Sequence, residues 1–131
     1  MRAAVVGVTG YSGTELFRIL SNHPKIEEIN LYAREKDGIS KRFLNKEVSA
    51  FRNIENELLP YDAKEIMERN DVVFFAVPAG VTSKLAAPFI QNDFPVIDLS
   101  GDFRLKDPKE YEKWYKKLAA PEEELEASCY G

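Results

Sequence analysis

The 131-residue sequence predicts an α/β fold, Rossmann-like and doubly wound, in which helices flank a mostly parallel sheet. Residues 3–8 form an apolar run without polar alternation, which is typical of a strand buried on both faces. Residues 71–78 form a second such run and predict a central strand. Helical segments alternate with the strands through short connections, which favours right-handed crossovers in one domain, residues 1–131, with about five strands.

Three glycines, at positions 7, 10 and 13, separate the first strand from the first helix. This strand, turn and helix are the context of a dinucleotide-binding site, although the spacing is GxxGxxG rather than GxGxxG. Backbone N–H groups in such a turn approach a pyrophosphate closely, and the helix N-terminus favours its charge. The alternative is a tight turn that binds nothing. We predict pyrophosphate contacts from five consecutive residues, Thr9, Gly10, Tyr11, Ser12 and Gly13.

The first helix is predicted to run from about Ser12 or Gly13 to Leu20, and residues 21–24 end it because the residue before a proline is disfavoured in a helix. The only histidine, His23, lies at this break, and we interpret it as a surface residue rather than a catalytic one. The side of the helix that faces the sheet is predicted to carry Leu16, Ile19 and Leu20.

Residues 26–33 predict the second strand, and the residue after it bears on the choice of cofactor. A carboxylate there receives the ribose 2′-hydroxyl of NAD, whereas an arginine accommodates the 2′-phosphate of NADP. Arg34 stands about 21 positions beyond Gly13, close to the expected separation. We therefore predict NADP, with Arg34 on its phosphate. In the alternative, Arg34 is an ordinary loop charge and Glu35 lies nearer the ribose.

The middle of the chain predicts a surface excursion over residues 35–56, with one short strand, and a third strand over residues 57–60. Asp62 is predicted to cap a helix that stops at Asn70. The turn after the central strand leads into a helix over residues 82–90 and lies at the carboxyl edge, where doubly wound folds bind ligands. Pro78 and Ala79 are therefore a second predicted cofactor contact, with a rigid turn as the alternative.

The last third of the chain predicts a strand over residues 94–99, which brings the polar loop 100–104 to the same edge of the sheet. The acidic residues 122–124 indicate a solvated segment, and residues 127–130 are predicted to begin another strand. A helix opened by Asp107 carries an apolar stripe that predicts core or interdomain packing: Tyr111, Trp114, Tyr115 and Leu118.

Composition argues against several classes of protein. A net charge of −4 disfavours a surface for nucleic acid or anionic membranes. No apolar run approaches the roughly 20 residues of a membrane span, and the N-terminal apolar segment is too short for a signal peptide. The single cysteine rules out an intrachain disulfide framework and suits a reducing compartment. We expect a cytoplasmic protein that binds no metal.

Three separated motifs stand out: residues 7–16, residues 77–82, and residues 96–107 with their continuation into 111–115. Together they resemble the N-acetyl-gamma-glutamyl-phosphate reductase family over essentially the whole chain. The resemblance implies an NADP-dependent oxidoreductase that reduces N-acetylglutamyl 5-phosphate to the semialdehyde, with release of phosphate, in arginine biosynthesis. It also implies that Pro78, Ala79 and Ser100 lie along the path toward the nicotinamide.

The catalytic residues of that family have no counterpart in this sequence. Its nucleophile belongs to an Asn-Pro-Gly-Cys motif, which is absent, and its histidine is not matched by His23. Cys129 resembles a position upstream of that motif and has no base or cation beside it in sequence, so we interpret it as not the nucleophile. The chain is thus expected to be the truncated, inactive cofactor half of a homo-oligomeric enzyme whose missing domain binds the small acyl phosphate.

Two departures from the family pattern affect the expected contacts. Ala33 stands where the family often has a serine, and Ala79 stands where it commonly has a histidine. The alternatives are an N-acetyl-aminoadipyl-phosphate reductase, a relative of aspartate-semialdehyde dehydrogenase, or a nucleotide-sensing module without catalysis.

Overall fold

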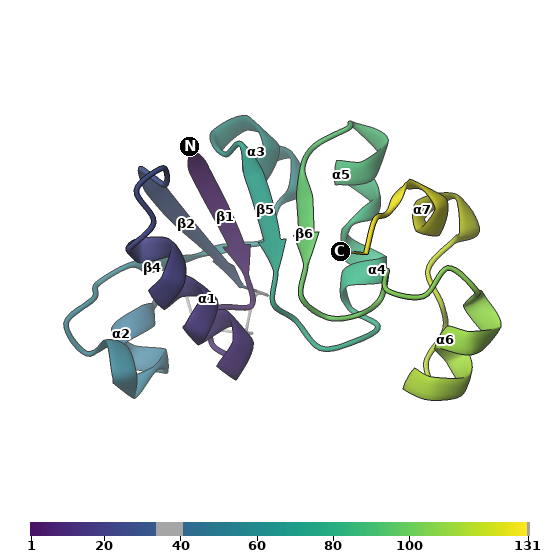
Figure 1. The fold of residues 1–131 in the computed structure, drawn as a ribbon. Coiled ribbons are helices and arrows are strands. Elements are labelled where there is room, and N and C mark those ends of the chain that lie inside the picture. The colour runs from purple at the N-terminus through teal and green to yellow at the C-terminus, as the bar shows by residue number, and fades with distance from the viewer. Residues whose placement is uncertain (34–40, 131) are drawn as a thin grey trace.

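The computed structural model describes residues 1–33 and 41–130. Within these residues six strands form one sheet in the order β3-β4-β2-β1-β5-β6 (Figure 1). Every neighbouring pair is parallel except β3 with β4, so the predicted doubly wound α/β class is confirmed. The strands are β1 (Arg2–Val6), β2 (Glu28–Ala33), β3 (Arg42–Phe43), β4 (Glu57–Pro60), β5 (Val72–Phe75) and β6 (Val96–Asp98).

Helices cover both faces of the sheet and enclose two apolar clusters. One face carries α1 (Tyr11–Ser21), α2 (Leu44–Glu47) and the 3-10 helix η1 (Ser49–Phe51). The other carries α3 (Ala63–Arg69), α4 (Thr82–Leu85), α5 (Ala87–Gln91) and α7 (Glu122–Ala127). The remaining helix, α6 (Pro108–Tyr115), lies beyond β6 at the right of Figure 1.

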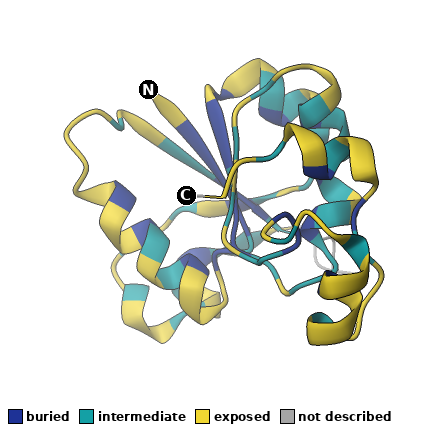
Figure 2. Cartoon of the chain, turned by 45° about the vertical axis from the view of Figure 1, so that its right-hand side comes forward, coloured by how far each residue is buried: buried dark blue, intermediate teal, exposed yellow. Residues whose placement is uncertain are grey.

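The central strand β1 is buried on both faces, as its apolar sequence predicts. Successive strand side chains point to opposite faces. Ala3 and Val5 therefore join the cluster beneath α1, whereas Ala4 and Val6 join the cluster beneath α5. Figure 2 shows the consequence: the inner strands are dark blue, and the outer helix surfaces are yellow.

The order in which strands are added to the sheet reverses at β1, and this reversal positions the site. From β1 the chain first adds β2 on one side and later adds β5 on the other. The carboxyl ends of β1 and β5 therefore flank the point where the strand order reverses, which is where open α/β sheets bind ligands.

Two expected helices differ from the structure for local reasons. The helix predicted over residues 82–90 is two helices, α4 and α5, because Pro88 has no N–H to continue the hydrogen-bond ladder of α4. On α1 the residue buried beside Leu20 is Phe17, whereas Ile19 is 51% exposed. The buried face follows Gly13, Phe17 and Leu20, since Gly13 is the point where α1 touches the segment directly after β1.

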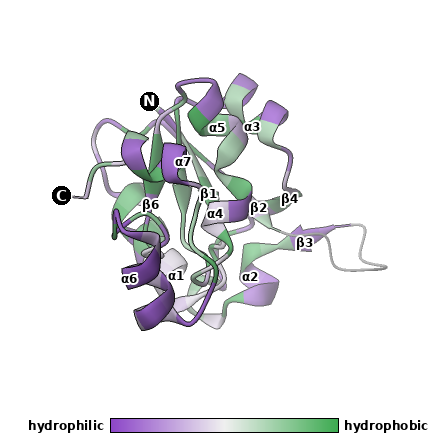
Figure 3. Ribbon diagram, turned by 90° about the vertical axis from the view of Figure 1, so that its right-hand side faces the viewer, coloured by the Kyte–Doolittle hydropathy of each residue, from purple (hydrophilic) through white to green (hydrophobic). Residues whose placement is uncertain are grey.

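The C-terminal third also differs from expectation. Of the predicted stripe on α6, Tyr111 is buried, but Trp114 is 66% and Leu118 is 82% exposed. The helix ends at Tyr115 because Lys116 adopts a left-handed conformation (φ 55°), and Figure 3 shows α6 as largely hydrophilic. Residues 128–130 form no strand; the acidic segment is instead the helix α7, anchored by the buried Leu125.

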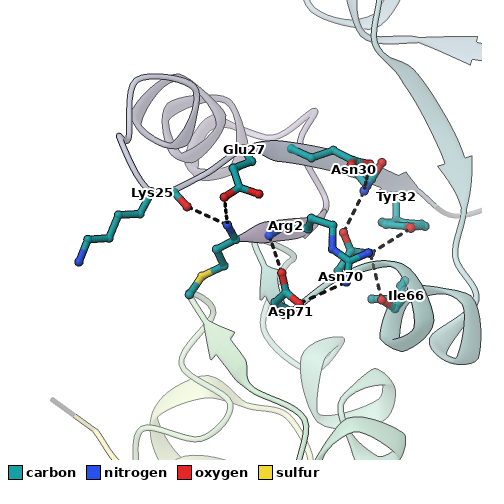
Figure 4. Close-up of polar contacts among 10 residues, drawn as sticks. Arg2, Lys25, Glu27, Asn30, Tyr32, Ile66, Asn70 and Asp71 are labelled. Atoms are coloured by element: carbon teal, nitrogen blue, oxygen red, sulfur yellow. Dashed lines mark hydrogen bonds and ion pairs between the residues drawn. The ribbon is translucent and has the colours of Figure 1, made fainter.

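A buried amide at the end of α3, opposite the site, joins this helix to side chains of β2 (Figure 4). Asn70, which is 3% exposed, donates from Nδ2 to the Ile66 carbonyl at 2.9 Å and to the Tyr32 hydroxyl at 3.3 Å. Its Oδ1 accepts from Asn30 Nδ2 at 3.0 Å. The residue predicted to stop α3 thus also satisfies polar groups between α3 and β2.

We expect Asn70→Ala to lower the free energy of unfolding by about 1–3 kcal/mol, because buried polar groups lose their partners. Asn92→Ala is the matched control, since Asn92 Nδ2 makes the same contact with the carbonyl four residues earlier, Pro88 O at 2.7 Å, in an exposed position. Urea denaturation measures both. Equal losses in the two variants would contradict the role given to burial.

Candidate functional site

The carboxyl ends of three strands meet at Gly7, directly after β1. Gly7 N donates to Tyr32 O of β2 at 3.2 Å, and Ala76 N, after β5, donates to Val6 O at 2.9 Å. Gly7 has φ +92°, and a Cβ on it would stand 2.6 Å from Ala76 O. Only glycine therefore fits between the two neighbouring segments.

The helix α1 is seated directly on this turn through Gly13. A Cβ at Gly13 would lie 2.2 Å from Gly7 O and 2.7 Å from Val8 Cα. Thr14 fixes the contact from two sides, because its N–H donates to Gly10 O at 2.8 Å and its hydroxyl donates to Val8 O at 3.2 Å. The start of the helix is thereby held against the carboxyl end of β1.

Gly10 has no such packing reason to be glycine. A Cβ there would meet Gly7 O at an ordinary 3.9 Å, and the backbone angles, φ −82° and ψ 169°, suit any residue. Gly10 caps α1 without a side-chain hydrogen bond, and the first turn of the helix contains no acidic residue. Since the first N–H groups of a helix lack partners within it, this end of α1 is open to an anion.

The turn after β5 and the start of α4 are held by two carboxylates, one at the end of β6 (Asp98) and one in the loop after it (Asp102). Asp102, fully buried, accepts from Gly80 N at 2.7 Å and from Ser83 N at 2.9 Å. Asp98 accepts from the Thr82 hydroxyl at 2.8 Å, and from the backbone N–H and the hydroxyl of Ser100 at 2.9 and 2.8 Å. The two loops at the carboxyl edge are therefore one hydrogen-bonded unit.

Asp102 also reaches α6, and its electrostatics follow from its donors. Its Oδ1 accepts from the Tyr111 hydroxyl at 2.6 Å. Burial opposes ionisation of Asp102, but hydrogen bonds from Tyr111, Ser83 and Gly80 outweigh it and hold the pKa of this carboxyl below its ordinary value. Burial, and then the hydrogen bond to Asp102, raises the pKa of Tyr111. The pair is therefore a neutral phenol on a carboxylate near neutral pH.

The structure brings most of the predicted cofactor residues to one edge. Ser100 joins this edge because Leu99 N, beside it, donates to Phe75 O at the end of β5. Arg34 lies outside the described residues, although it directly follows Ala33, the last residue of β2. The predicted residues that follow β1, β5 and β6 are Thr9, Gly10, Tyr11, Ser12, Gly13, Pro78, Ala79 and Ser100.

Sequence reasoning missed the two carboxylates that organise this edge. The loop 100–104 was expected to be polar, but Asp102 is buried and Asp98 accepts hydrogen bonds from both loops. The available signal was an aspartate between Gly101 and Phe103, where a charge among residues of a tight turn indicates a set of donors. The donors themselves, Gly80 N and Ser83 N, lie nineteen or more positions earlier in the sequence, so the sequence did not identify them.

Cys129 and His23 lie apart from the glycine turn. Cys129 is exposed and lines a cavity of about 610 Å³ beside β6, together with Ser100, Arg104 and Tyr115. His23 follows the far end of α1, where its Nδ1 accepts from Lys25 N at 3.2 Å. Over residues 1–33 and 41–130, no group of three or more His, Cys, Asp or Glu residues is placed to hold a metal ion. In the same residues, no helix is long and apolar enough to cross a membrane.

Residues 2–128 match the family described as semialdehyde dehydrogenase, NAD-binding domain. The chain is 46% identical over 131 residues to N-acetyl-gamma-glutamyl-phosphate reductase 2 of Lactiplantibacillus plantarum, covering 100% of this chain and 38% of that protein. It is 42% identical over 135 residues to the N-acetyl-gamma-glutamyl-phosphate reductase of Bacillus subtilis, covering 100% of this chain and 37% of that one. The chain thus spans less than two fifths of the length of these relatives.

Solved structures that this chain resembles in fold include aspartate-semialdehyde dehydrogenases. The enzyme from Candida albicans, solved with NADP, aligns with a TM-score of 0.60 at 18% identity, over 82% of this chain and 31% of that one. A probable aspartate-semialdehyde dehydrogenase from Pseudomonas aeruginosa aligns with a TM-score of 0.54 at 25% identity, over 77% and 28%. The first likeness concerns the fold alone.

The three glycines of the turn differ in what they tolerate. We expect Gly13→Ala to lower the free energy of unfolding by about 3 kcal/mol, because the methyl group overlaps the backbone of Gly7. Gly10→Ala is the matched variant and should change it by less than about 1 kcal/mol, since the conformation is allowed for alanine. Chemical denaturation measures the free energy of unfolding of both variants. A large decrease in Gly10→Ala would show that Gly10 has a packing role.

Proposed function

This chain belongs to the semialdehyde dehydrogenase NAD-binding family, and we propose that it is the NADP(H)-binding domain of an N-acetyl-gamma-glutamyl-phosphate reductase. The observation that carries the proposal is the glycine turn. Gly7 and Gly13 bring α1 onto the end of β1, and Gly10 leaves its N-terminus open at the point where the strand order reverses. A pyrophosphate fits this place by charge and by close backbone approach.

The order of the strands gives the bound dinucleotide a direction. With the pyrophosphate on residues 9–13, the adenosine extends toward the end of β2, where Arg34 follows. The nicotinamide then extends the other way, past the turn with Pro78 and Ala79 after β5 and toward Ser100 after β6. Bound NADPH supplies a hydride for reduction.

The choice of NADP rests on Arg34. An arginine guanidinium carries a permanent charge in a planar fork that suits a phosphate, and it offers a face for stacking on adenine. Ala33, before Arg34, offers no carboxylate that would favour an unphosphorylated ribose, and Glu35, after it, is the carboxylate of the alternative.

The proposed reaction of the whole enzyme follows from its relatives. They are named as reductases at 42–46% identity, whereas the structural neighbours named as aspartate-semialdehyde dehydrogenases are 18–25% identical, so we favour N-acetylglutamyl phosphate as the substrate. In this proposal the thiol and histidine of catalysis belong to the part of the relatives that this chain does not span. We propose a cytoplasmic homo-oligomer that binds neither nucleic acid nor membranes, consistent with a net charge of −4.

Calorimetry with NADPH and NADH tests the cofactor. We expect NADPH to bind more tightly, and Arg34→Ala to remove most of the difference, about 1.5–3 kcal/mol, which is the usual contribution of a charge-assisted hydrogen bond. Arg18→Ala, which removes an equal charge from the last turn of α1, should leave the preference unchanged. Equal affinities for the two cofactors in the unmutated chain would contradict the assignment to NADP.

Cys129 provides a second test. We expect the chain alone to oxidise no NADPH in the presence of N-acetylglutamyl phosphate, because the proposed catalytic thiol and histidine belong to the part of the relatives that this chain does not span. Absorbance at the nicotinamide band measures this. Turnover that disappears in Cys129→Ser would show that Cys129 is a nucleophile after all.

A further inference from the structure

We propose that Asp102 is a positioning residue for the nicotinamide half of the cofactor: its carboxylate fixes the turn after β5 against the loop after β6. This inference rests on the proposed function, since it assigns a role within the same site. Asp102 itself is fully buried and does not need to touch the cofactor.

Hydrogen-bond donors from several elements converge on the side chain of Asp102. Asp102 accepts from Gly80 N and Ser83 N, in the turn after β5 and the first residues of α4, and from the Tyr111 hydroxyl of α6. Its own N–H donates to the Ser100 hydroxyl at 3.1 Å. One residue thereby joins three segments that are separated in sequence.

Asp102 fixes where the turn after β5 lies, not its internal shape. Gly80 adopts φ +85°, which glycine tolerates, and Val81 N closes the turn on Pro78 O at 3.1 Å. The contact that joins this turn to the loop after β6 is the hydrogen bond from Gly80 N to Asp102 Oδ1 at 2.7 Å. The position of Pro78 and Ala79 relative to that loop therefore depends on a carboxylate that follows another strand.

The two halves of the site are supported by different contacts. The glycine turn is held by direct backbone packing at Gly7 and Gly13, which Asp102 does not contact. The side predicted to receive adenosine and pyrophosphate thus has its own support, whereas the side predicted to receive nicotinamide depends on Asp102. A change at Asp102 should affect ligands according to which half they occupy.

The experiment compares two ligands on the full chain: NADPH, and adenosine 2′,5′-bisphosphate, which lacks the nicotinamide half. In Asp102→Asn the volume is kept, but the new –NH2 group faces one of the backbone donors. We expect the Kd for NADPH to rise roughly tenfold, because the turn loses its fixed position against the loop after β6, and the Kd for the bisphosphate to stay within about twofold. Asp107→Asn is the matched control, since Asp107 caps α6 from an exposed position.

Tyr111→Phe keeps the test decisive if Asp102→Asn does not fold. It removes one donor to Asp102 and leaves those of Gly80 and Ser83, so we expect the same selective loss of NADPH affinity, about threefold. Equal weakening of both ligands, or of neither, would overturn the role of Asp102 while the proposed function stands. Failure of the unmutated chain to bind either ligand would overturn both.

Discussion

The close approach of three backbone segments at the end of β1 is the constraint on which the rest of the site depends. Gly7 is wedged against Ala76 after β5, bonded to Tyr32 of β2, and covered by Gly13 of α1. At the contacts of Gly7 with Ala76 and of Gly13 with Gly7, a Cβ would overlap backbone atoms. The approach of the segments after β1 and β5 and the position of α1 thus depend on the absence of side chains at these two glycines. A helix N-terminus placed in this way meets the crevice at the reversal of strand order.

The two halves of the edge are stabilised by different physics. Around the glycine turn the contacts are steric, short and independent of charge. Around the turn after β5 they are hydrogen bonds to two carboxylates, Asp98 at the end of β6 and Asp102 in the loop after it. In the proposed function, packing of the first kind supports the part of a dinucleotide that all such cofactors share. The second kind links the turn proposed to face the nicotinamide to α6.

The sequence predicted the features that arise locally. Apolar runs predicted β1 and β5, Asp62 and Asp107 were recognisable as helix caps, and the spacing of glycines predicted the turn. Features that depend on distant partners were not predictable. Trp114 and Leu118 have helical spacing with Tyr111, yet both are exposed, whereas Tyr111 is buried and donates to the distant Asp102. Asp102 looked like an ordinary loop charge, since its donors lie on other elements. The role of Arg34 is still a prediction, because it lies outside the described residues.

A titration followed by 15N-resolved NMR tests the central claim most directly, because every non-proline backbone N–H reports separately on contact with a ligand. With NADPH, the account predicts shifts concentrated in residues 9–13, with further shifts at Ala79 and Ser100. It predicts little change at the opposite edge, around Asn70 and Asp71, where the amino ends of the strands are tied together. Shifts confined to the cavity beside β6, with residues 9–13 unchanged, would contradict it.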